Sequence, residues 1–401
     1  MDNFRKLVVL TKWLNSVSKK RAFKNYTERI FGGVKSSDKD LGDITFVNLN
    51  RKTEGNKDQK HSCVMKSCKS DLPWTKIIGT KTMYQNEIYF YQKVLPTFAQ
   101  FQEKKSVREP FNHFPECYYA KIYEGIEVMI LKNMRKEGYL MHNGACPMSE
   151  ESIRKIVQIF GKFHAISFAL RDQNPKIFRT FARDLTDVTR LLADEDDEME
   201  EDRFFVDLYK IAKEKKLLEI SNKLFKLPNM IDTVDSTDSF AVIVHGDAEP
   251  GNFLFKYTDN ERSKLDQVCF LDFQRSRLAS PVYDLSCLLF SCMSGDDVKN
   301  FDDFNKLYYE SLSDFLRQLG SDPDKMFPFD ELENQWKMYG KFGLRRMVTV
   351  TKNYLLDQED VFSLGEVLES ILEVSFSTKA VEKCGDRIFP MIKLAIDKEM
   401  I

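Results

Sequence analysis

The chain has 401 residues, of which 42% are hydrophobic and 12% aromatic, a composition typical of a folded protein rather than a disordered one. Its length is sufficient for two or three domains, or for one enzyme of two lobes with its own core. The net charge of −2 gives no reason to expect nucleic acid or an anionic membrane surface as a partner.

The eight cysteines are scattered, and no two of them form a C-x-x-C pair. Their spacing predicts neither a zinc site nor a disulfide framework, so free thiols in a reducing cytosol are expected. Near the N-terminus, apolar residues recur at helical spacing, but the uninterrupted apolar run covers only residues 7–10. That run is too short for a signal peptide, and no other segment approaches a membrane span. We therefore expect a cytoplasmic protein with an amphipathic N-terminal helix and no evident obligate protein partner.

The first third of the chain predicts a small sheet with one helix. Alternating and β-branched residues indicate strands over 43–49 and 61–68, and a hairpin over 118–134 that turns at Glu124-Gly125. Between them, residues 79–96 have a helical pattern that ends at a proline.

From Ser149 the pattern becomes helical. Ser149 is a candidate N-cap followed by acidic residues, and an apolar stripe begins at Ile153. His164 lies on that stripe, where a core histidine is a better interpretation than a ligand. The acidic run over 194–202 interrupts further helices and is interpreted as a solvated helix face or surface loop.

After a strand–loop–strand unit over 240–272, the pattern is helical to the C-terminus, with breaks near Gly295, at Pro323 to Pro328 and near Gly385. The chain therefore divides into a sheet-rich N-terminal lobe, residues 1–134, and a larger helical lobe, residues 135–401. A cleft between two lobes is a usual place for a ligand.

The loop "HGDAEPGN" at 245–252 separates two short apolar strands and carries His245, Asp247 and Asn252 in the spacing H-x-D-x-x-x-x-N. Turn chemistry alone favours Asp, Asn, Gly and Pro in such a loop. A catalytic loop is the alternative interpretation, and the next strand bears on the choice.

That strand, over 267–273, contains Asp272 within a DFQ triplet. The hairpin places Asn252 and Asp272 at its start and finish, where their side chains can share a hard cation such as Mg²⁺. Asp247 is then free to orient a hydroxyl and accept its proton. This division of roles is what phosphoryl transfer needs.

Lys66 lies inside a predicted strand, and Glu87 lies on the apolar face of the following helix. A carboxylate buried there without a partner would be costly. The two residues account for each other if they form the ion pair that positions ATP phosphates. Alternatively, Lys66 faces solvent from an edge strand and Glu87 reaches outward. The downstream loop favours the pair.

Asp284 precedes an apolar helix in "SPVYDLSCLLF". It is either a helix N-cap or a buried acid that anchors the backbone of the catalytic loop, and the two interpretations are compatible. His245 is expected to hydrogen-bond within the loop rather than act as a base, because Asp247 is the better placed acceptor.

The segments "VIVHGDAEPGNFLFKY" and "VCFLDFQRSRLASPVYDLSCLLF" together resemble the ecdysteroid kinase-like (CHK kinase-like) family, which belongs with choline and aminoglycoside kinases. "NEIYFYQKVLP" resembles that family's helix with the ATP-pairing glutamate, and "VMILKNMRKEGYL" resembles its interlobe hinge. DFQ in place of DFG argues against a protein kinase.

The resemblance implies an α+β, bilobal, protein-kinase-like fold and an ATP- and Mg²⁺-dependent kinase that phosphorylates a hydroxyl of a steroid-like or other small alcohol. By resemblance, Asp247 is the catalytic base, and His245 and Asp284 support its loop. The remaining roles are Mg²⁺ binding by Asn252 and Asp272, ATP positioning by Lys66 and Glu87, and adenine contact by the backbone around Leu131, Asn133 and Met134.

The chain departs from the family's pattern in several places. The phosphate loop expected over 36–46 has one glycine, Gly42, as its candidate nucleotide contact, and no G-x-G-x-x-G. Lys132 replaces a common acid in the hinge. Glu249 and Gly251 replace bulkier or amide residues beside the acceptor. Two alternatives therefore stand beside the kinase: a non-catalytic ligand-binding pseudokinase on the same fold, and a choline-type kinase.

Overall fold

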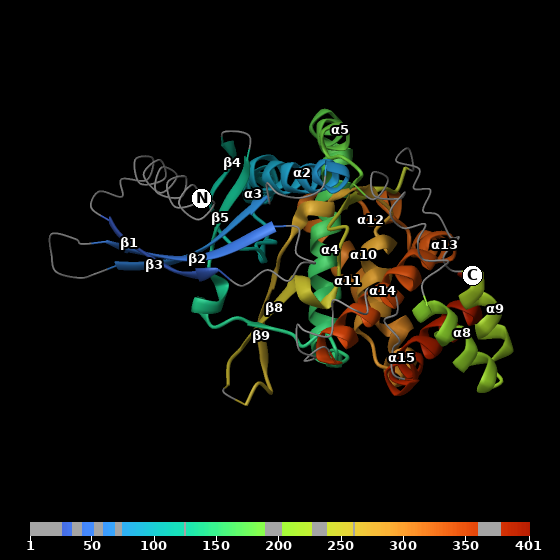
Figure 1. Ribbon diagram of the computed structural model, residues 1–401. Coiled ribbons are helices and arrows are strands. Elements are labelled where there is room, and N and C mark those ends of the chain that lie inside the picture. The colour runs from blue at the N-terminus through green and yellow to red at the C-terminus, as the bar shows by residue number, and fades with distance from the viewer. Residues whose placement is uncertain are drawn as a thin grey trace. The chain divides into compact units, whose positions relative to one another are not determined.

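The computed structural model describes residues 26–33, 42–51, 59–68, 74–123, 126–188, 203–226, 239–259, 261–359 and 378–401. They form two compact units (Figure 1). The first contains the described residues up to Leu95 together with Phe114–Leu140, and the second contains Pro96–His113 and the described residues from Met141 to Ile401. The expected N-terminal helix, residues 36–41 of the phosphate loop, the turn at Glu124-Gly125 and the acidic run 194–202 lie outside the described residues.

The first unit is built on a five-stranded antiparallel sheet with the strand order β1-β2-β3-β5-β4. Its strands are β1 (Tyr26–Gly33), β2 (Gly42–Arg51), β3 (Gln59–Cys68), β4 (Cys117–Tyr123) and β5 (Ile126–Lys132). The sequence predicts all of these except β1. Helix α2 (Trp74–Tyr89) packs on β3, β4 and β5 and buries Met83 against the sheet. The short helix η2 (Met134–Glu137) follows β5.

The predicted end of the helix at Pro96 is wrong. The π-helical segment η1 (Phe90–Val94) continues α2, and α3 (Leu95–Lys105) follows without a break. Leu95 donates its N–H to the Phe90 carbonyl, as in a π-helical turn. Proline lacks an N–H and is tolerated in the first turn of a helix, so Pro96 fits where α3 begins.

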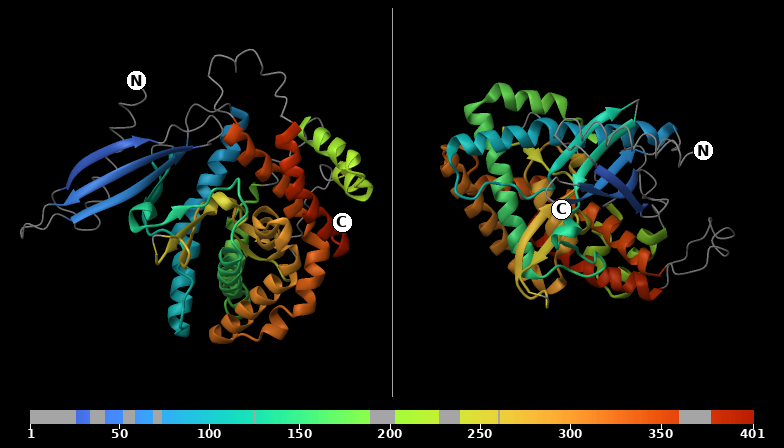
Figure 2. Two further views of the ribbon diagram at one scale, coloured as in Figure 1. Left: turned by 90° about the horizontal axis from the view of Figure 1, so that it is seen from below. Right: turned by 90° about the vertical axis from the view of Figure 1, so that its left-hand side faces the viewer.

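The second unit is mostly helical. Its helices are α3, α4 (Glu150–Gln173), α5 (Pro175–Asp184), α8 (Arg203–Glu214), α9 (Leu218–Lys226), α10 (Val282–Cys292), η6 (Gly295–Asn300), α11 (Phe301–Leu319), α12 (Pro323–Met326), α13 (Phe329–Tyr339), α14 (Lys341–Glu359) and α15 (Thr378–Asp397). Ser149 caps α4 by accepting a hydrogen bond from the Ser152 N–H, as the sequence predicts. Helix α4 packs against α11 and α10, and its apolar stripe is fully buried. Both views in Figure 2 show the green ribbon of α4 beside the orange helices of this unit.

Short strands carry the loops of the second unit. They are β6 (Leu140–Met141), where the chain passes from the first unit to the second, β7 (Val242–Val244), β8 (Phe253–Tyr257), β9 (Leu265–Phe270) and β10 (Arg277–Ala279), with turns η4 (Pro250–Asn252) and η5 (Phe273–Arg275). β7 pairs with β10, and β8 pairs with β9 as the predicted hairpin.

Two further expectations differ from the structure. The helical break near Gly385 is wrong, because Gly385 lies within α15. Its missing side chain accommodates Phe389, whose ring would lie 2.7 Å from an added β-carbon. Residues 96–113, assigned by sequence to the N-terminal lobe, pack in the second unit. The packing of aromatic rings accounts for this placement. The ring centres of Phe98 and Phe111 lie 5.9 and 5.1 Å from that of Phe163 on α4.

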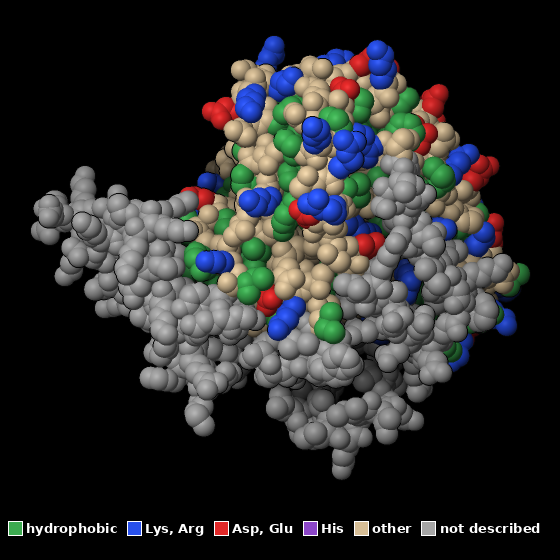
Figure 3. Space-filling view, turned by 90° about the horizontal axis from the view of Figure 1, so that it is seen from above, with side chains coloured by type: hydrophobic (Ala, Val, Ile, Leu, Met, Phe, Trp, Pro, Cys, Tyr) green, Lys and Arg blue, Asp and Glu red, His purple; other side chains and the backbone are tan. Residues whose placement is uncertain are grey.

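The surface in Figure 3 has hydrophobic side chains of the described residues scattered among Lys and Arg, rather than gathered in one patch. Single exposed apolar residues are normal on a protein surface. The described part of this face therefore gives no indication of an apolar docking surface.

The crossing of α4 and α11 depends on Gly161. A β-carbon there would lie 2.8 Å from the Leu312 nitrogen and the Tyr308 carbonyl oxygen, both backbone atoms. Gly161→Ala is expected to lower the free energy of unfolding by about 1–3 kcal/mol through overpacking, measured by urea denaturation. Lys306→Ala, at an exposed position of α11, is the control and should change it by less than about 0.5 kcal/mol. Equal effects would contradict the close-approach account.

Candidate active site

In the first unit, Lys66 of β3 and Glu87 of α2 form a buried ion pair. Lys66 Nζ lies 2.9 Å from Glu87 Oε2, and the two side chains are 11% and 1% exposed. The pairing predicted from the sequence is therefore confirmed, and the alternative of a solvent-facing Lys66 is wrong. Each charge accounts for the other, because burying either one without a partner would carry a large desolvation cost.

The expected hinge residues span the end of β5 and the two residues after it. Lys132 donates its N–H to the Glu116 carbonyl at 2.8 Å, and Asn133 donates its N–H to the Ser62 carbonyl at 2.9 Å. The Asn133 amide also bonds the Ser62 hydroxyl, while its oxygen accepts from the Arg135 N–H. These two backbone N–H groups are thus used within the unit, so adenine contact through them would require breaking existing bonds.

The other expected hinge residues are Leu131, Met134 and Lys132. Leu131 is buried in the sheet, and Met134 begins η2. Lys132, which replaces a common acid, forms a half-exposed ion pair with Glu137 at 3.0 Å.

Gly42, the candidate nucleotide contact of the expected phosphate loop, is the first residue of β2 and pairs with Cys68.

In the second unit, the carboxylate of Asp284 holds the backbone of the 245–252 loop. Its Oδ2 accepts the His245 N–H at 2.7 Å, and its Oδ1 accepts the Gly246 N–H at 2.8 Å. Asp284 is fully buried in the first turn of α10, beyond the N-cap position, and makes no capping bond there. The loop-anchor interpretation is therefore confirmed, and the N-cap interpretation is wrong.

His164 completes this buried group. Its Nε2 lies 3.1 Å from Asp284 Oδ2, and its Nδ1 lies 3.0 Å from the hydroxyl of Tyr308. The sequence predicts His164 to be a core residue, and its complete burial confirms this. What the pattern did not reveal is that His164 contacts the carboxylate that anchors the loop.

Glycine is required at position 246 for two reasons. Its φ of +82° lies in the left-handed region, and an added β-carbon would lie 2.1 Å from the Arg275 carbonyl oxygen. L-residues rarely adopt that conformation, and the carbonyl leaves no room for a side chain. The "HGD" triplet can therefore pass this close to η5 only with glycine at its centre.

His245 has a structural position in the loop, as predicted. Its Nε2 lies 2.7 Å from the Leu271 carbonyl oxygen, which can only accept, so this nitrogen carries the proton. Its Nδ1 accepts the Asp247 N–H at 3.3 Å. The ring thus joins the loop to the residue before Asp272.

Asn252 and Asp272 lie close together at one end of the β8–β9 hairpin. The Leu271 N–H donates to the Asn252 carbonyl at 2.9 Å, next to Asp272. The Asn252 amide nitrogen donates to the Asp247 carbonyl at 2.8 Å, which leaves its oxygen as the remaining side-chain acceptor. Asp272 adopts a left-handed conformation, with φ 59° and ψ 63°, which aspartate tolerates better than most residues.

This pair of oxygen-bearing side chains suits Mg²⁺, which commonly binds one or two protein ligands together with substrate phosphates. Among the described residues, no group of three or more His, Cys, Asp or Glu side chains is placed to hold a metal ion. A cation at this hairpin would therefore depend on Asn252, Asp272 and a phosphate-bearing substrate, rather than on a cage made by the protein alone.

Asp247 is buried between two guanidinium groups that the sequence analysis did not single out. Arg346 Nη2 lies 2.7 Å from Asp247 Oδ1, and Arg275 Nε lies 3.9 Å from Oδ2. Burial opposes ionisation of Asp247, but the positive charges of Arg346 and Arg275 outweigh it and hold the pKa of Asp247 below its ordinary value. Asp247 is therefore an ionised acceptor at neutral pH.

Helix α14 accounts for both departures from the family's pattern in the 245–252 loop. The same Arg346 nitrogen bonds Glu249 Oε2 at 2.9 Å. An added β-carbon at Gly251 would lie 2.5 Å from the hydroxyl of Tyr354, which is two turns further along the helix. Glu249 thus provides a partner for Arg346, and Gly251 leaves room for Tyr354. The sequence signal for this contact is an arginine at position 346 within the apolar pattern of "FGLRRMVTV".

All eight cysteines are free thiols, as expected. Burial raises the pKa of Cys63 and that of Cys287, and Arg346 opposes the shift of Cys287. Neither therefore has the character of a nucleophile. None of the helices that the structure describes combines the length and apolarity needed to cross a membrane.

Removal of the Asp284 carboxylate is expected to destabilise the second unit. Asp284→Ala leaves two buried N–H groups and His164 without their acceptor, which should cost about 3 kcal/mol or more in the free energy of unfolding. Urea denaturation followed by circular dichroism measures the change. Asp314→Ala removes an exposed carboxylate of α11 that bonds Gln318 and should cost less than about 1 kcal/mol. A comparable loss in both variants would contradict the anchor.

Comparison with known families identifies the chain. The model of the ecdysteroid kinase-like family matches residues 39–321, which is more than half of the chain. The chain therefore belongs to that family, and it has the expected α+β organisation of a small sheet-rich part and a larger helical part. The match covers the 245–252 loop and the hairpin but ends before α14. A search among curated proteins gave no match.

Proposed function

We propose that this member of the ecdysteroid kinase-like family is a small-molecule kinase, which transfers the γ-phosphoryl group of ATP to a hydroxyl of a steroid-like or other small alcohol. One observation carries the proposal: the anchored loop brings the ionised Asp247 together with Asn252 and Asp272, which lies at the end of the next strand. An acceptor for a proton and two oxygen ligands for a cation then stand at one place, as phosphoryl transfer requires.

In the proposed reaction, Asp247 accepts a hydrogen bond from the acceptor hydroxyl and orients its oxygen toward the γ-phosphorus. A bond forms between that oxygen and phosphorus, the bond to the β,γ-bridging oxygen breaks, and ADP leaves. The hydroxyl proton passes to Asp247. Bound Mg²⁺, held by Asn252 and Asp272, would offset the charge of the phosphates. In the first unit, the Lys66 ammonium, kept in place by Glu87, contacts ATP phosphates.

The charges around Asp247 favour a neutral acceptor over a cationic one. Arg346 and Arg275 place two positive charges beside Asp247, and burial together with Asp247 raises the pKa of Glu249 to about 7. A quaternary ammonium group would meet like charges here, and a partly protonated Glu249 offers it little attraction. This observation disfavours the choline-type alternative, in which acidic and aromatic side chains are expected around the acceptor.

One observation favours the non-catalytic alternative. Arg346 Nη2 donates a hydrogen bond to Asp247 Oδ1 at 2.7 Å. A carboxylate oxygen of Asp247 would have to receive the proton of the acceptor hydroxyl. If that bond persists when substrates bind, the protein would hold ligands without turning them over. In the kinase proposal, the acceptor hydroxyl shares Asp247 with Arg346 or takes Oδ2.

Nucleotide binding tests the role of the buried pair. ATP with Mg²⁺ should raise the melting temperature of the wild-type protein, because ligand binding to the native state is stabilising. The double variant Lys66→Met/Glu87→Gln leaves no unpaired charge and should lose most of this shift. Lys121→Met, at an exposed position of β4, should retain it. A full shift in the double variant would refute the assignment.

Substitution of the base tests catalysis. Asp247→Asn should lower kcat by about 10²- to 10⁴-fold, the usual contribution of general acid–base catalysis, while the thermal shift with ATP and Mg²⁺ persists. Turnover is measured with an alcohol that the wild-type protein phosphorylates, and circular dichroism verifies folding. Asp266→Asn, an exposed position of β9, should leave kcat unchanged. Undiminished turnover in Asp247→Asn would show that Asp247 is not the base.

A further inference from the structure

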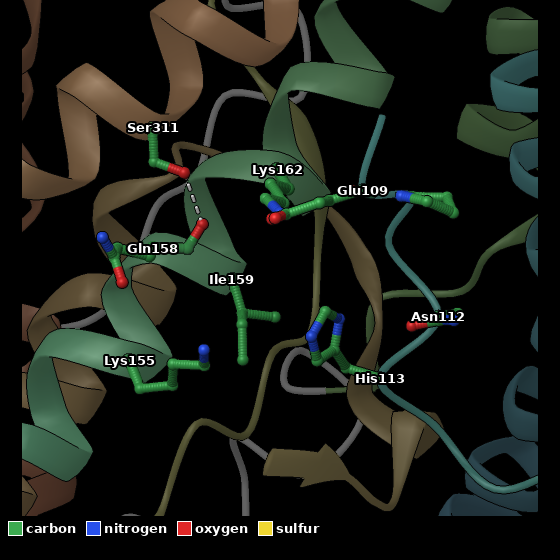
Figure 4. A pocket seen from close by; sticks show the side chains of 9 residues that line it. Glu109, Asn112, His113, Lys155, Gln158, Ile159, Lys162 and Ser311 are labelled. Carbon is green, nitrogen blue, oxygen red and sulfur yellow. Dashed lines mark hydrogen bonds and ion pairs between the residues drawn. The ribbon is translucent and has the colours of Figure 1, made fainter. Parts of the chain in front are cut away.

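A concave surface in the helical unit is made by residues outside the 245–252 loop. It is a cavity of about 340 Å³ between α4 and the segment Glu109–His113, with Ser311 of α11 at its edge (Figure 4). The volume lies in the range of small-molecule sites. Neither the proposed phosphoryl transfer nor the Asp284 anchor uses any of its side chains.

Two lysines of α4 give this cavity its charge. Lys155 and Lys162 are seven residues apart and therefore lie on one face of the helix, with Ile159 between them. In Figure 4 the Lys155 side chain extends toward the ring of His113. Within the described ranges, the Lys155 ammonium forms no ion pair at direct contact; its charge acts on Glu109 from a distance, where it lowers the pKa of that carboxyl.

The partner of Lys162 is weakly held. Lys162 Nζ lies 2.8 Å from Glu109 Oε2 and 3.3 Å from the Glu109 carbonyl oxygen, but the Glu109 side chain is 84% exposed. Ion pairs with such exposed carboxylates contribute little, because water competes for both charges. A ligand with two negative charges can therefore compete with Glu109 for Lys162 while it also neutralises Lys155.

His113 adds a partly buried ring to the wall. Its Nδ1 is buried and has no hydrogen-bond partner among the residues that the structure describes. Burial lowers the pKa of His113 to about 4; the charges of Lys162 and Lys155 act in the same direction, and Glu109 opposes them. The ring is thus neutral near pH 7, and it faces two ammonium groups that would favour an anion beside it.

Hydrogen bonds and ring packing within the protein hold the segment that carries His113 in place. Gln102 of α3 accepts the Phe111 N–H at 2.6 Å, and the Phe111 ring packs 5.1 Å from that of Phe163. The His113 carbonyl accepts the Phe270 N–H at 2.7 Å. Phe270 ends β9, two residues before Asp272, so one backbone hydrogen bond joins the cavity wall to the strand that leads to Asp272.

From this arrangement we propose that the cavity binds a small molecule that carries a phosphate group, with the phosphate oxygens held by Lys155 and Lys162 beside the ring of His113. A phosphate dianion matches two ammonium groups better than a monocarboxylate does, since it presents two charges and several acceptor oxygens. The remaining volume accommodates a small organic group. The inference does not depend on the proposed kinase activity.

Nuclear magnetic resonance of the histidine rings tests the site directly. The chain has five histidines, so the ring signals can be separated, and His113→Gln identifies the one that belongs to His113. Inorganic phosphate, added to the full chain without nucleotide at constant ionic strength, should shift the His113 signal in a saturable manner. It should also raise the pKa of His113 by about one unit or more, because a nearby dianion stabilises the protonated ring. Acetate at the same ionic strength should leave the signal in place.

Three variants separate binding from general charge effects. Lys155→Gln should weaken phosphate binding at least about fivefold through loss of a charge-assisted contact. Glu109→Gln should strengthen it, because the competing carboxylate is removed. Lys306→Gln, at an exposed site on α11, should leave it unchanged. The site is refuted if phosphate produces no saturable shift, if acetate acts as strongly, or if Lys155→Gln behaves like Lys306→Gln. None of these outcomes bears on ATP binding or on Asp247.

Discussion

The buried carboxylate of Asp284 determines the shape of the 245–252 loop. It accepts the N–H groups of two consecutive loop residues and contacts His164 of α4. Because α10, α4 and the loop meet at this single group, the backbone of "HGD" is fixed by the helical core rather than by the loop's own turn chemistry. Gly246 is a consequence of the same constraint: with its φ of +82° the chain passes within reach of the Arg275 carbonyl. Asp247, the next residue, is thereby held beside the β8–β9 hairpin.

Helix α14 is a second constraint and lies beyond the family match. It packs closely on α10 at Gly343, where an added β-carbon would lie 2.3 Å from the Ser286 backbone. That approach brings Arg346, one turn later, to Asp247 and Glu249. The 245–252 loop and α14 therefore pack together because Glu249 bonds Arg346 and Gly251 leaves room for Tyr354. We interpret these residues as adaptations to α14, with consequences for the acceptor, rather than as losses of catalytic residues.

Local pattern was sufficient to predict most strands, the N-cap of α4, the Lys66–Glu87 pair and the hairpin that joins Asn252 to Asp272. These features depend on residues near in sequence, or on a buried charge that needs a partner. The sequence did not reveal Arg346, which reaches Asp247 from 99 positions away, or the link from His164 to Asp284. The sequence does not indicate the continuation of the helix through Pro96, because a π-helical turn has no distinct residue signature. Pairings between distant helices depend on packing that periodicity does not encode.

The most direct test of the central claim is transfer of a labelled γ-phosphoryl group from ATP to a panel of alcohols, with products identified by mass. The panel should contain neutral hydroxylated steroids, other neutral alcohols and choline. The account predicts that the label appears on a hydroxyl of a neutral acceptor, with choline a poor substrate because of the guanidinium groups beside Asp247. A protein that binds ATP but transfers label to none of these alcohols, or transfers it preferentially to choline, would contradict the account.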